Sequence, residues 1–214
     1  MSLIPAFELG SWNAWIVMVP SLLLMLFWLL LMTKKHAPPP PKNARMSKTT
    51  QLFNIISKLI YFPAVAYSVF MPLELGTVWF YIGLPITLMG LVGSLMVVVN
   101  WASTPAGEPV TRGIYRYSRH PGYVAEVLLL LGVSIISASW IFLLFPIIIW
   151  GGAAHFIKIE EACTLGHYGK AYREYMNRTP RWMGIPKSGK KDSDRSDASR
   201  SRTQACPQSS EEKW

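Results

Sequence analysis

Two short polar segments stand out in a chain of 214 residues, of which 51% are hydrophobic. The first covers residues 113–123 and reads GIYRYSRHPGY, so cations, an imidazole and aromatic rings lie beside a long apolar stretch. In the second, Glu160 and Glu161 close another apolar run and precede residues 169–175, which read GKAYREY. Polar chemistry this dense next to apolar segments predicts a reaction site at the edge of a bilayer.

His120, Pro121 and Tyr123 form a helix-entry arrangement, because proline fits the first turn, where its missing N–H costs nothing. The free N–H groups of a first turn attract anions, so a ligand carboxylate or phosphate would fit there. The alternative is structural: basic residues contact lipid headgroups and tyrosines form an aromatic belt. The residues concerned are Arg116, Arg119 and His120, and Tyr115, Tyr117 and Tyr123.

Carboxylates mark two further positions. Glu126 lies one turn inside the apolar run after Tyr123, where an ionised carboxylate is costly unless it is paired or hydrated. It is either part of a site or a structural partner of Arg119 or Lys58. Glu160 and Glu161 could hold a cationic amine or ribose hydroxyls, or be solvated at a helix end. Because a helix C-terminus disfavours negative charge, a bound cation or nearby arginines are expected.

Residues 165–176 follow helical spacing and predict an amphipathic helix. Such a helix lies along the membrane surface or caps a cofactor bound between the ends of the spans. Arg178 and Arg181 come next and offer cations for an acidic group of a substrate. The apolar face holds Leu165, Tyr168, Tyr172, Tyr175 and Met176, and the polar face holds Lys170, Arg173, Glu174 and Asn177.

Long apolar runs must position these residues. The first lacks any charge and, at about 1.5 Å per residue, reaches roughly 30 Å, the thickness of a hydrocarbon core. Basic residues follow it rather than precede it, which argues against a cleaved signal peptide. We therefore predict an all-α polytopic membrane bundle of about five spans, with a tight hairpin at Ser137–Ser139 between the last two. The runs are Trp12–Met32, Leu52–Leu73, Thr77–Asn100, Tyr123–Ser137 and Trp140–Ile159.

Lysine and arginine set the orientation. With five spans, the basic segments after the first and third runs and at the C-terminus share one face, which the positive-inside rule makes cytoplasmic. Lys58 departs from this pattern but could snorkel to the same surface. The net charge of +9 follows from this topology, so we expect no nucleic-acid partner. Cys163 and Cys206 lack metal-ligand spacing, and we expect neither a metal nor a disulfide.

The chain divides into a membrane domain over residues 1–186 and a polar tail over 187–214 that we expect to be disordered, because it has almost nothing apolar to bury. An extended polyproline spacer is predicted at residues 36–42. Prolines should kink or break their helices, and glycines of the third run should permit close packing rather than form a cavity. These are Pro63, Pro72, Pro85 and Pro146, and Gly83, Gly90 and Gly93.

Taken together, the two polar segments resemble the isoprenylcysteine carboxyl methyltransferases and the related phospholipid methyltransferases. The resemblance covers roughly the C-terminal third before the tail, and the order of its parts, with one hairpin between them, makes it fairly specific. The matching motifs are Thr111-x-Gly113-x-Tyr115, Arg119-His120-Pro121-x-Tyr123 with Gly132 beyond, Glu160-Glu161, Gly169-x-x-Tyr172-x-x-Tyr175 and Arg178-x-Pro180-Arg181.

The resemblance implies a membrane-embedded helical enzyme that transfers a methyl group from S-adenosylmethionine to a lipophilic acceptor: a prenylcysteine carboxylate, a phospholipid amine or a similar small hydrophobic molecule. The active site would face the cytoplasm, from the endoplasmic reticulum in a eukaryote or the inner membrane in a prokaryote, among membrane lipids. The implied cofactor contacts are Tyr115, Arg119, His120, Pro121, Tyr123, Glu160, Glu161 and Tyr172.

A sulfonium methyl donor needs little acid–base help, so alignment of the reacting atoms and exclusion of water matter most. Arg178, Arg181 or Lys158 could orient an acceptor carboxylate or phosphate, and Glu126 could serve as the base for an amine; the catalytic candidates are Arg178, Glu126 and Lys158. Two departures from the family pattern concern the acceptor and the packing. Ala125 replaces a usual glycine, and His155 and Lys158 stand where prenylcysteine enzymes place an arginine.

Two other classes of protein stay open. Membrane sterol reductases, which use NADPH, share an arginine or asparagine before His-Pro-x-Tyr and a glutamate at the position of Glu126. They lack the Glu-Glu and Gly-x-x-Tyr-x-x-Tyr segment. A non-enzymatic membrane scaffold would use the proline linker and the tail to bind partners, but it leaves the charged ends of the spans unexplained.

Overall fold

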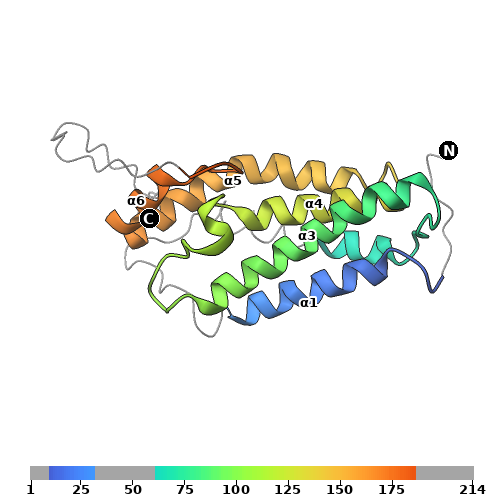
Figure 1. Ribbon diagram of the computed structural model, residues 1–214, viewed down its shortest axis with the longest axis horizontal. Coiled ribbons are helices and arrows are strands. Elements are labelled where there is room, and N and C mark those ends of the chain that lie inside the picture. Colours follow the sequence, from blue (N-terminus) through green and yellow to red (C-terminus); the bar gives the residue numbers. More distant parts are fainter. Residues whose placement is uncertain (1–9, 32–60, 187–214) are drawn as a thin grey trace, which may run out of the picture.

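The computed structural model describes residues 10–31 and 61–186, and this part of the chain is helical, without a β-strand. The predicted all-α class is confirmed. Figure 1 shows long helices running side by side, with the short helix α6 at one end. The elements are α1 (Trp15–Leu31), helical residues 61–68, α3 (Val78–Ser103), the 3₁₀ helix η2 (Gly113–Arg116), α4 (Pro121–Ile136), α5 (Leu144–Tyr168) and α6 (Lys170–Arg178).

Helix α3 begins where the Thr77 hydroxyl accepts a hydrogen bond from the Phe80 N–H at 3.4 Å. The helix is 26 residues long and continues through Pro85. By length and composition it is the one helix of the described part that could cross a membrane. The other apolar helices are shorter: Trp15–Leu31, Pro121–Ile136 and Leu144–Ala154. Pro85 was predicted to kink or break its helix, and the helix is not broken there.

The predicted second span, Leu52–Leu73, ends earlier than expected. Its residues 52–60 lie outside the described part, and the helical residues stop at 68. Pro72 is not inside a helix but forms an isolated antiparallel bridge with Asn13, and the Asn13 side-chain amide donates to the Val69 carbonyl at 2.7 Å. This bridge ties the start of α1 to the segment that leads into α3.

Helices α3 and α4 pack with their backbones close together through small residues. A Cβ atom on Gly83 would lie 2.7 Å from the backbone nitrogen of Ile136, one on Gly90 would collide with the backbone of Leu129, and one on Gly132 with Thr87. These glycines therefore serve helix packing, as predicted, rather than a cavity. Ala125 belongs to the same contact, because a Cβ on Gly93 would sit 3.0 Å from the Ala125 Cβ.

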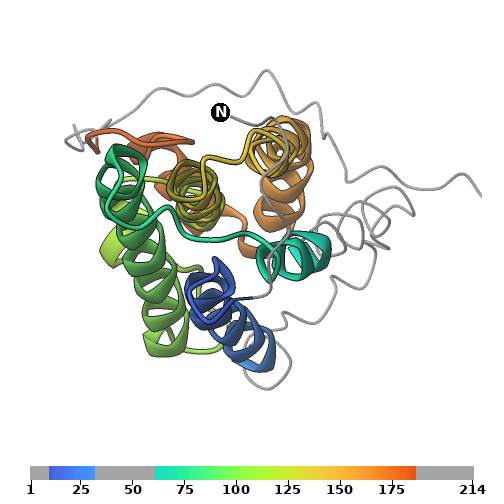
Figure 2. The same cartoon turned by 90° about the vertical axis from the view of Figure 1, so that its right-hand side faces the viewer.

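Helices α4 and α5 form the predicted hairpin, but its turn is longer than Ser137–Ser139. The first helix ends at Ile136 and the second begins at Leu144. Within the turn, Ala138 has a φ of 46°, and the Ser139 hydroxyl accepts from the Phe142 N–H at 3.2 Å. Viewed along the bundle, α4 lies between α3 and α5 (Figure 2). Pro146 is tolerated because it lies in the first turn of α5.

The predicted helix over residues 165–176 is interrupted at Gly169. This residue has φ 56° and ψ −124°, a backbone conformation that glycine adopts without steric penalty, and it separates α5 from α6. The apolar face of α6 does not lie free. Tyr172 and Tyr175 are buried with Tyr115 and Val97, so α6 packs over η2 and the end of α3.

Candidate active site

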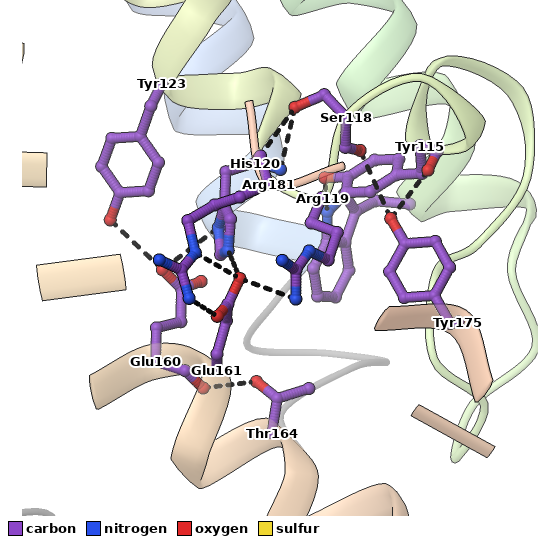
Figure 3. Close-up of polar contacts among 11 residues, drawn as sticks. Tyr115, Ser118, Arg119, His120, Tyr123, Glu160, Glu161, Thr164, Tyr175 and Arg181 are labelled. Carbon is purple, nitrogen blue, oxygen red and sulfur yellow. Dashed lines mark hydrogen bonds and ion pairs between the residues drawn. The ribbon is translucent and has the colours of Figure 1, made fainter. Parts of the chain in front are cut away.

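The first part of the site is built at the start of α4. His120 is the N-cap residue, Pro121 occupies the first turn as predicted, and the Ser118 hydroxyl accepts from the His120 N–H at 3.1 Å. Only 7% of His120 is exposed. The histidine is therefore held by the turn before α4, and its ring points away from the apolar half of the helix toward α5 (Figure 3).

The two polar segments meet at this histidine. Its Nε2 lies 3.2 Å from Oε1 of Glu161, which is 41 residues further along the chain (Figure 3). Because an ionised carboxylate can only accept, the Nε2 atom carries the hydrogen in this pair. The segment around His120 and the paired glutamates, which the resemblance implied as contacts of one cofactor, therefore lie side by side.

Glu161 is buried and fully paired. Oε1 accepts from Arg181 Nε at 3.2 Å and lies 3.1 Å from Arg119 Nη1, while Oε2 lies 2.7 Å from Arg181 Nη2. Burial by itself raises the pKa of Glu161, but the hydrogen bonds from His120 and Arg181 and the two guanidinium charges outweigh it and lower the pKa to about 2. The arginines predicted to compensate these carboxylates are therefore Arg119 and Arg181.

Glu160 differs from its neighbour in exposure and in partners. Its side chain is 43% exposed, against 4% for Glu161. The Tyr123 hydroxyl donates to its Oε2 at 3.4 Å, and His120 Nδ1 lies 3.7 Å from the same oxygen. Removal from water raises the pKa of Glu160 and the charge of Glu161 adds to this, while His120 and the Tyr123 hydrogen bond oppose it. This carboxylate has room for another partner.

A third segment, which follows α6, completes the cluster. The Arg119 N–H donates to the Pro180 carbonyl at 3.0 Å, and the Gly184 N–H donates to the Tyr117 carbonyl at 3.0 Å. These bonds hold residues 180–184 against residues 117–119 and place Arg181 within contact of Glu161. The sequence suggested that Arg178 and Arg181 both offer cations to a substrate. In the structure, Arg181 pairs with Glu161 of the protein itself.

Tyr115 and Tyr172, both predicted cofactor contacts, lie in the packed layer behind the cluster and are only 9% and 6% exposed. The Tyr175 hydroxyl, which the sequence did not single out as a site residue, donates to the Tyr115 carbonyl at 2.7 Å. Trp101 Nε1 donates to the Tyr115 hydroxyl at 2.7 Å. Burial raises the pKa of all three tyrosines, which therefore stay neutral. Tyr175 could have been found from the spacing of its motif.

The three catalytic candidates are not part of this cluster. Lys158 and Arg178 are exposed, and Arg178 lines a groove together with Thr111 and Arg116. Glu126 makes no hydrogen bond or ion pair within the described residues, although it lies near enough to the Tyr61 and Tyr123 phenols to interact with them electrostatically. The predicted pair of Glu126 with Arg119 is wrong, since Arg119 faces Glu161. Lys58 and the side chain of His155 lie outside the described part.

The arrangement suits a ligand that carries positive charge and hydroxyl groups. Glu160 supplies an accessible carboxylate with an aromatic ring beside it, while Glu161 is already neutralised by protein cations. Such a carboxylate forms charge-assisted hydrogen bonds, which are stronger than neutral ones. Within the described ranges, no three His, Cys, Asp or Glu side chains are placed to hold a metal ion.

Comparison with known proteins finds related sequences over this same region. A family model described as phospholipid methyltransferase matches residues 79–171. A protein from Schizosaccharomyces pombe named protein-S-isoprenylcysteine O-methyltransferase is 36% identical over 78 residues, which are 36% of this chain and 32% of that protein. A protein of the same name from Dictyostelium discoideum is 33% identical over 85 residues, 36% of this chain and 32% of its own. The match spans about a third of the length of these relatives.

Proposed function

We propose that the chain is a membrane methyltransferase of the phospholipid methyltransferase family, whose model matches residues 79–171, and that it uses S-adenosylmethionine and a lipophilic acceptor. The observation that carries the proposal is the meeting of His120 with Glu160 and Glu161 at the end of the apolar helices. His120, Glu160 and Glu161 all fall inside the matched region. A nucleoside-sized ligand with a cationic end would contact the surface formed by Arg119, His120, Tyr123 and Glu160, called the cofactor wall below.

The residues fit such a cofactor. S-adenosylmethionine supplies a methyl group on a positively charged sulfur, together with an ammonium group and ribose hydroxyls. Glu160 offers the accessible carboxylate for the positive charge or the hydroxyls, and the Tyr123 ring lies beside that carboxylate. Aromatic faces attract cations and would exclude water from the methyl group. His120 and Arg119 would complete the wall around this contact.

Glu161 has a different role in this proposal. All its close partners belong to the protein, so it positions His120, Arg119 and Arg181 rather than binding the cofactor. Tyr115 and Tyr172 support the same wall from behind. Eight cofactor contacts were expected from the sequence. In this proposal the four that lie nearest the ligand are Glu160, Tyr123, His120 and Arg119.

The acceptor would approach from the apolar side of the site. The named relatives act, by their names, on protein S-isoprenylcysteine, which carries a carboxylate next to a lipid group. Lys158, exposed on α5 and close in sequence to Glu160, is the candidate that would orient such a carboxylate. An amine acceptor would instead need a base, and Glu126 is the candidate one turn beyond Tyr123.

The membrane arrangement is part of the same proposal. The apolar helices α1, α4 and α5 and the helix that ends at residue 68 would cross the bilayer beside α3, with five spans in all. Basic residues then fall on the cytoplasmic face together with the site. Helix α6 would lie at that surface and close the site from the cytoplasmic side.

Calorimetry on the detergent-solubilised protein tests the cofactor. We expect binding of S-adenosylhomocysteine and none of NADPH. Glu160→Gln should weaken that binding roughly tenfold, or about 1.4 kcal/mol, because it removes one charge-assisted contact. The matched control is Glu108→Gln, an exposed carboxylate in the loop after α3, which should leave the affinity unchanged. Binding of NADPH alone would identify the protein as a reductase and overturn the proposal.

A labelling experiment tests the transfer. Membranes that contain the protein are incubated with methyl-labelled S-adenosylmethionine, and label is measured in lipids, prenylated thiols and small hydrophobic molecules. We expect label in one lipophilic class, and its loss in Glu160→Gln. Incorporation into water-soluble acceptors alone would contradict a lipophilic acceptor.

A further inference from the structure

Arg178 lines a groove that lies away from the cofactor wall. The groove has a volume of about 370 Å³, and Arg116 stands on it as well, so two cations 62 residues apart in sequence share one depression. Thr111 contributes to the same surface with its hydroxyl, and Glu174 contributes a carboxylate. The charged side chains of the groove therefore sum to +1.

Neither arginine has an ion-pair partner in the part of the chain that the structure describes. Arg116 and Arg178 are exposed and make no ion pair within the described residues, in contrast to Arg119 and Arg181, which both face Glu161. Each stands in the last turn of its helix, where the helix dipole favours a cation. The dipole explains a basic residue at each position. It does not explain why both, with a threonine, line the same groove.

Exposed apolar side chains stand next in sequence to two residues that line this groove. Tyr117 follows Arg116 and is 52% exposed, while Ile185 precedes the lining residue Pro186 and is 89% exposed. Met183 is 61% exposed. The segment that carries Tyr117 adjoins the segment that carries Met183 and Ile185, because the Gly184 N–H donates to the Tyr117 carbonyl at 3.0 Å. Cations beside exposed apolar groups match a ligand with an anionic head and an apolar body.

The segment that follows α6 also contacts an apolar helix. Trp182, next to Met183, packs on Trp150 with ring centroids 4.3 Å apart. Trp150 is part of the apolar stretch Leu144–Ala154 of α5, and its side chain is partly exposed. The exposed apolar side chains near the groove therefore belong to a segment that touches a helix proposed above to cross the bilayer.

We propose that the groove formed by Thr111, Arg116, Glu174 and Arg178 binds the headgroup of an anionic phospholipid from the surrounding bilayer. The arginines contact the phosphate, and the net charge of +1 matches a headgroup with one negative charge. Tyr117, Met183 and Ile185 contact the glycerol and the upper acyl chain. This site is separate from the cofactor wall, because the buried Tyr175 stands between the groove and the residues around Ser118.

Native mass spectrometry of the full chain tests this proposal. The protein is purified in detergent with equal amounts of dioleoylphosphatidylglycerol and dioleoylphosphatidylcholine, and the ratio of the two retained lipids is measured. We expect preferential retention of the glycerol lipid. In Arg116→Gln/Arg178→Gln the preference should fall roughly 25-fold, because each basic residue near an anionic lipid contributes about a factor of five.

The control is Arg112→Gln/Arg173→Gln, which removes the same charge from exposed arginines next to η2 and on α6 that do not line the groove. It should retain the wild-type preference. Equal losses in the two double variants would mean general electrostatic attraction and would overturn the site, as would an unchanged preference in the groove variant. Displacement of the lipid by soluble glycerol phosphate at similar concentration would overturn a membrane lipid as the occupant.

Discussion

The seam between α3 and α4 and the polar cluster around Glu161 hold the same helix, α4, in different ways. In the seam, glycines bring two backbones together without any charged group, and the contact repeats along both helices. In the cluster, one buried carboxylate collects cations from two separate segments. The seam depends on the shape of many small contacts, whereas the cluster depends on the presence of every partner.

This difference predicts how each region fails. Overpacking in a seam is partly relieved when helices shift apart, so the cost of a single change is moderate. A buried ion cluster cannot relax in the same way, because removal of its shared carboxylate leaves several cations without a counter-charge. Loss of the shared carboxylate should therefore destabilise the protein more than a single overpacked position in the seam.

The largest effect is expected for Glu161→Ala. The change leaves Arg119, Arg181 and His120 without their common acceptor, and the free energy of unfolding in detergent should fall by about 3–5 kcal/mol. Denaturant titration measures it. Glu108→Ala on the exposed loop should change this free energy by no more than about 0.5 kcal/mol. Similar losses in the two variants would show that the cluster is not a stabilising centre.

Acid should remove the same contribution reversibly. The pKa of Glu161 is lowered to about 2 in the folded protein, from an ordinary value of 4.5. A lowered carboxyl pKa stabilises the fold above the unfolded value and loses that effect as the pH falls through the folded value. Stability should therefore decline between pH 4.5 and about 2. The loss should be about 2–3 kcal/mol, and Glu161→Gln should lack that part of the decline.

In the seam, Gly90→Val should cost about 2–3 kcal/mol of unfolding free energy, because the new side chain meets the backbone of Leu129. Gly151→Val on α5 is the control, since nothing lies within 4 Å of a Cβ at that position. It should stay within about 0.5–1 kcal/mol of the wild type. A larger loss in the control would mean that the bulk of valine, and not the close approach of α4, decides the result.

The smallest effect is expected for Arg181→Lys. Lysine keeps the charge but cannot reach both oxygens of Glu161 in the way that the guanidinium does through Nε and Nη2. The free energy of unfolding should fall by about 1 kcal/mol. A loss as large as that of Glu161→Ala would show that the forked geometry, and not the charge, carries the cluster.

The sequence predicted the seam and the meeting of the polar segments well. Glycine spacing in α3 identifies a close helix contact because only glycine permits it, and the order of the motifs around His120 and Glu160 reflects their shared place. It did not separate Glu160 from Glu161, because adjacent residues of one type differ only through partners brought by the fold. It also offered Arg178 and Arg181 together as cations for a substrate, and could not show that Arg181 pairs with Glu161.

Helix ends were predicted less well for physical reasons. Pro85 was expected to kink or break α3, but the apolar helix continues through it without a break, and it packs against α4 along its length. The turn after α4 was expected to hold three residues; it extends to residue 143 because Ser139 caps the following turn and delays the next helix. Gly169 was part of a recognised motif, yet its positive φ and the break it causes were not foreseen.

The link from Glu161 to Arg181 also has a consequence for biosynthesis. Residues 180–184 are among the last described parts of the chain to be translated, and they provide one of the two guanidinium groups around Glu161. Until they leave the ribosome, the start of α4 lacks the hydrogen bonds that hold residues 117–119. A nascent chain stopped at residue 178 should therefore form its helices yet leave this end open until residues 180–184 have been added.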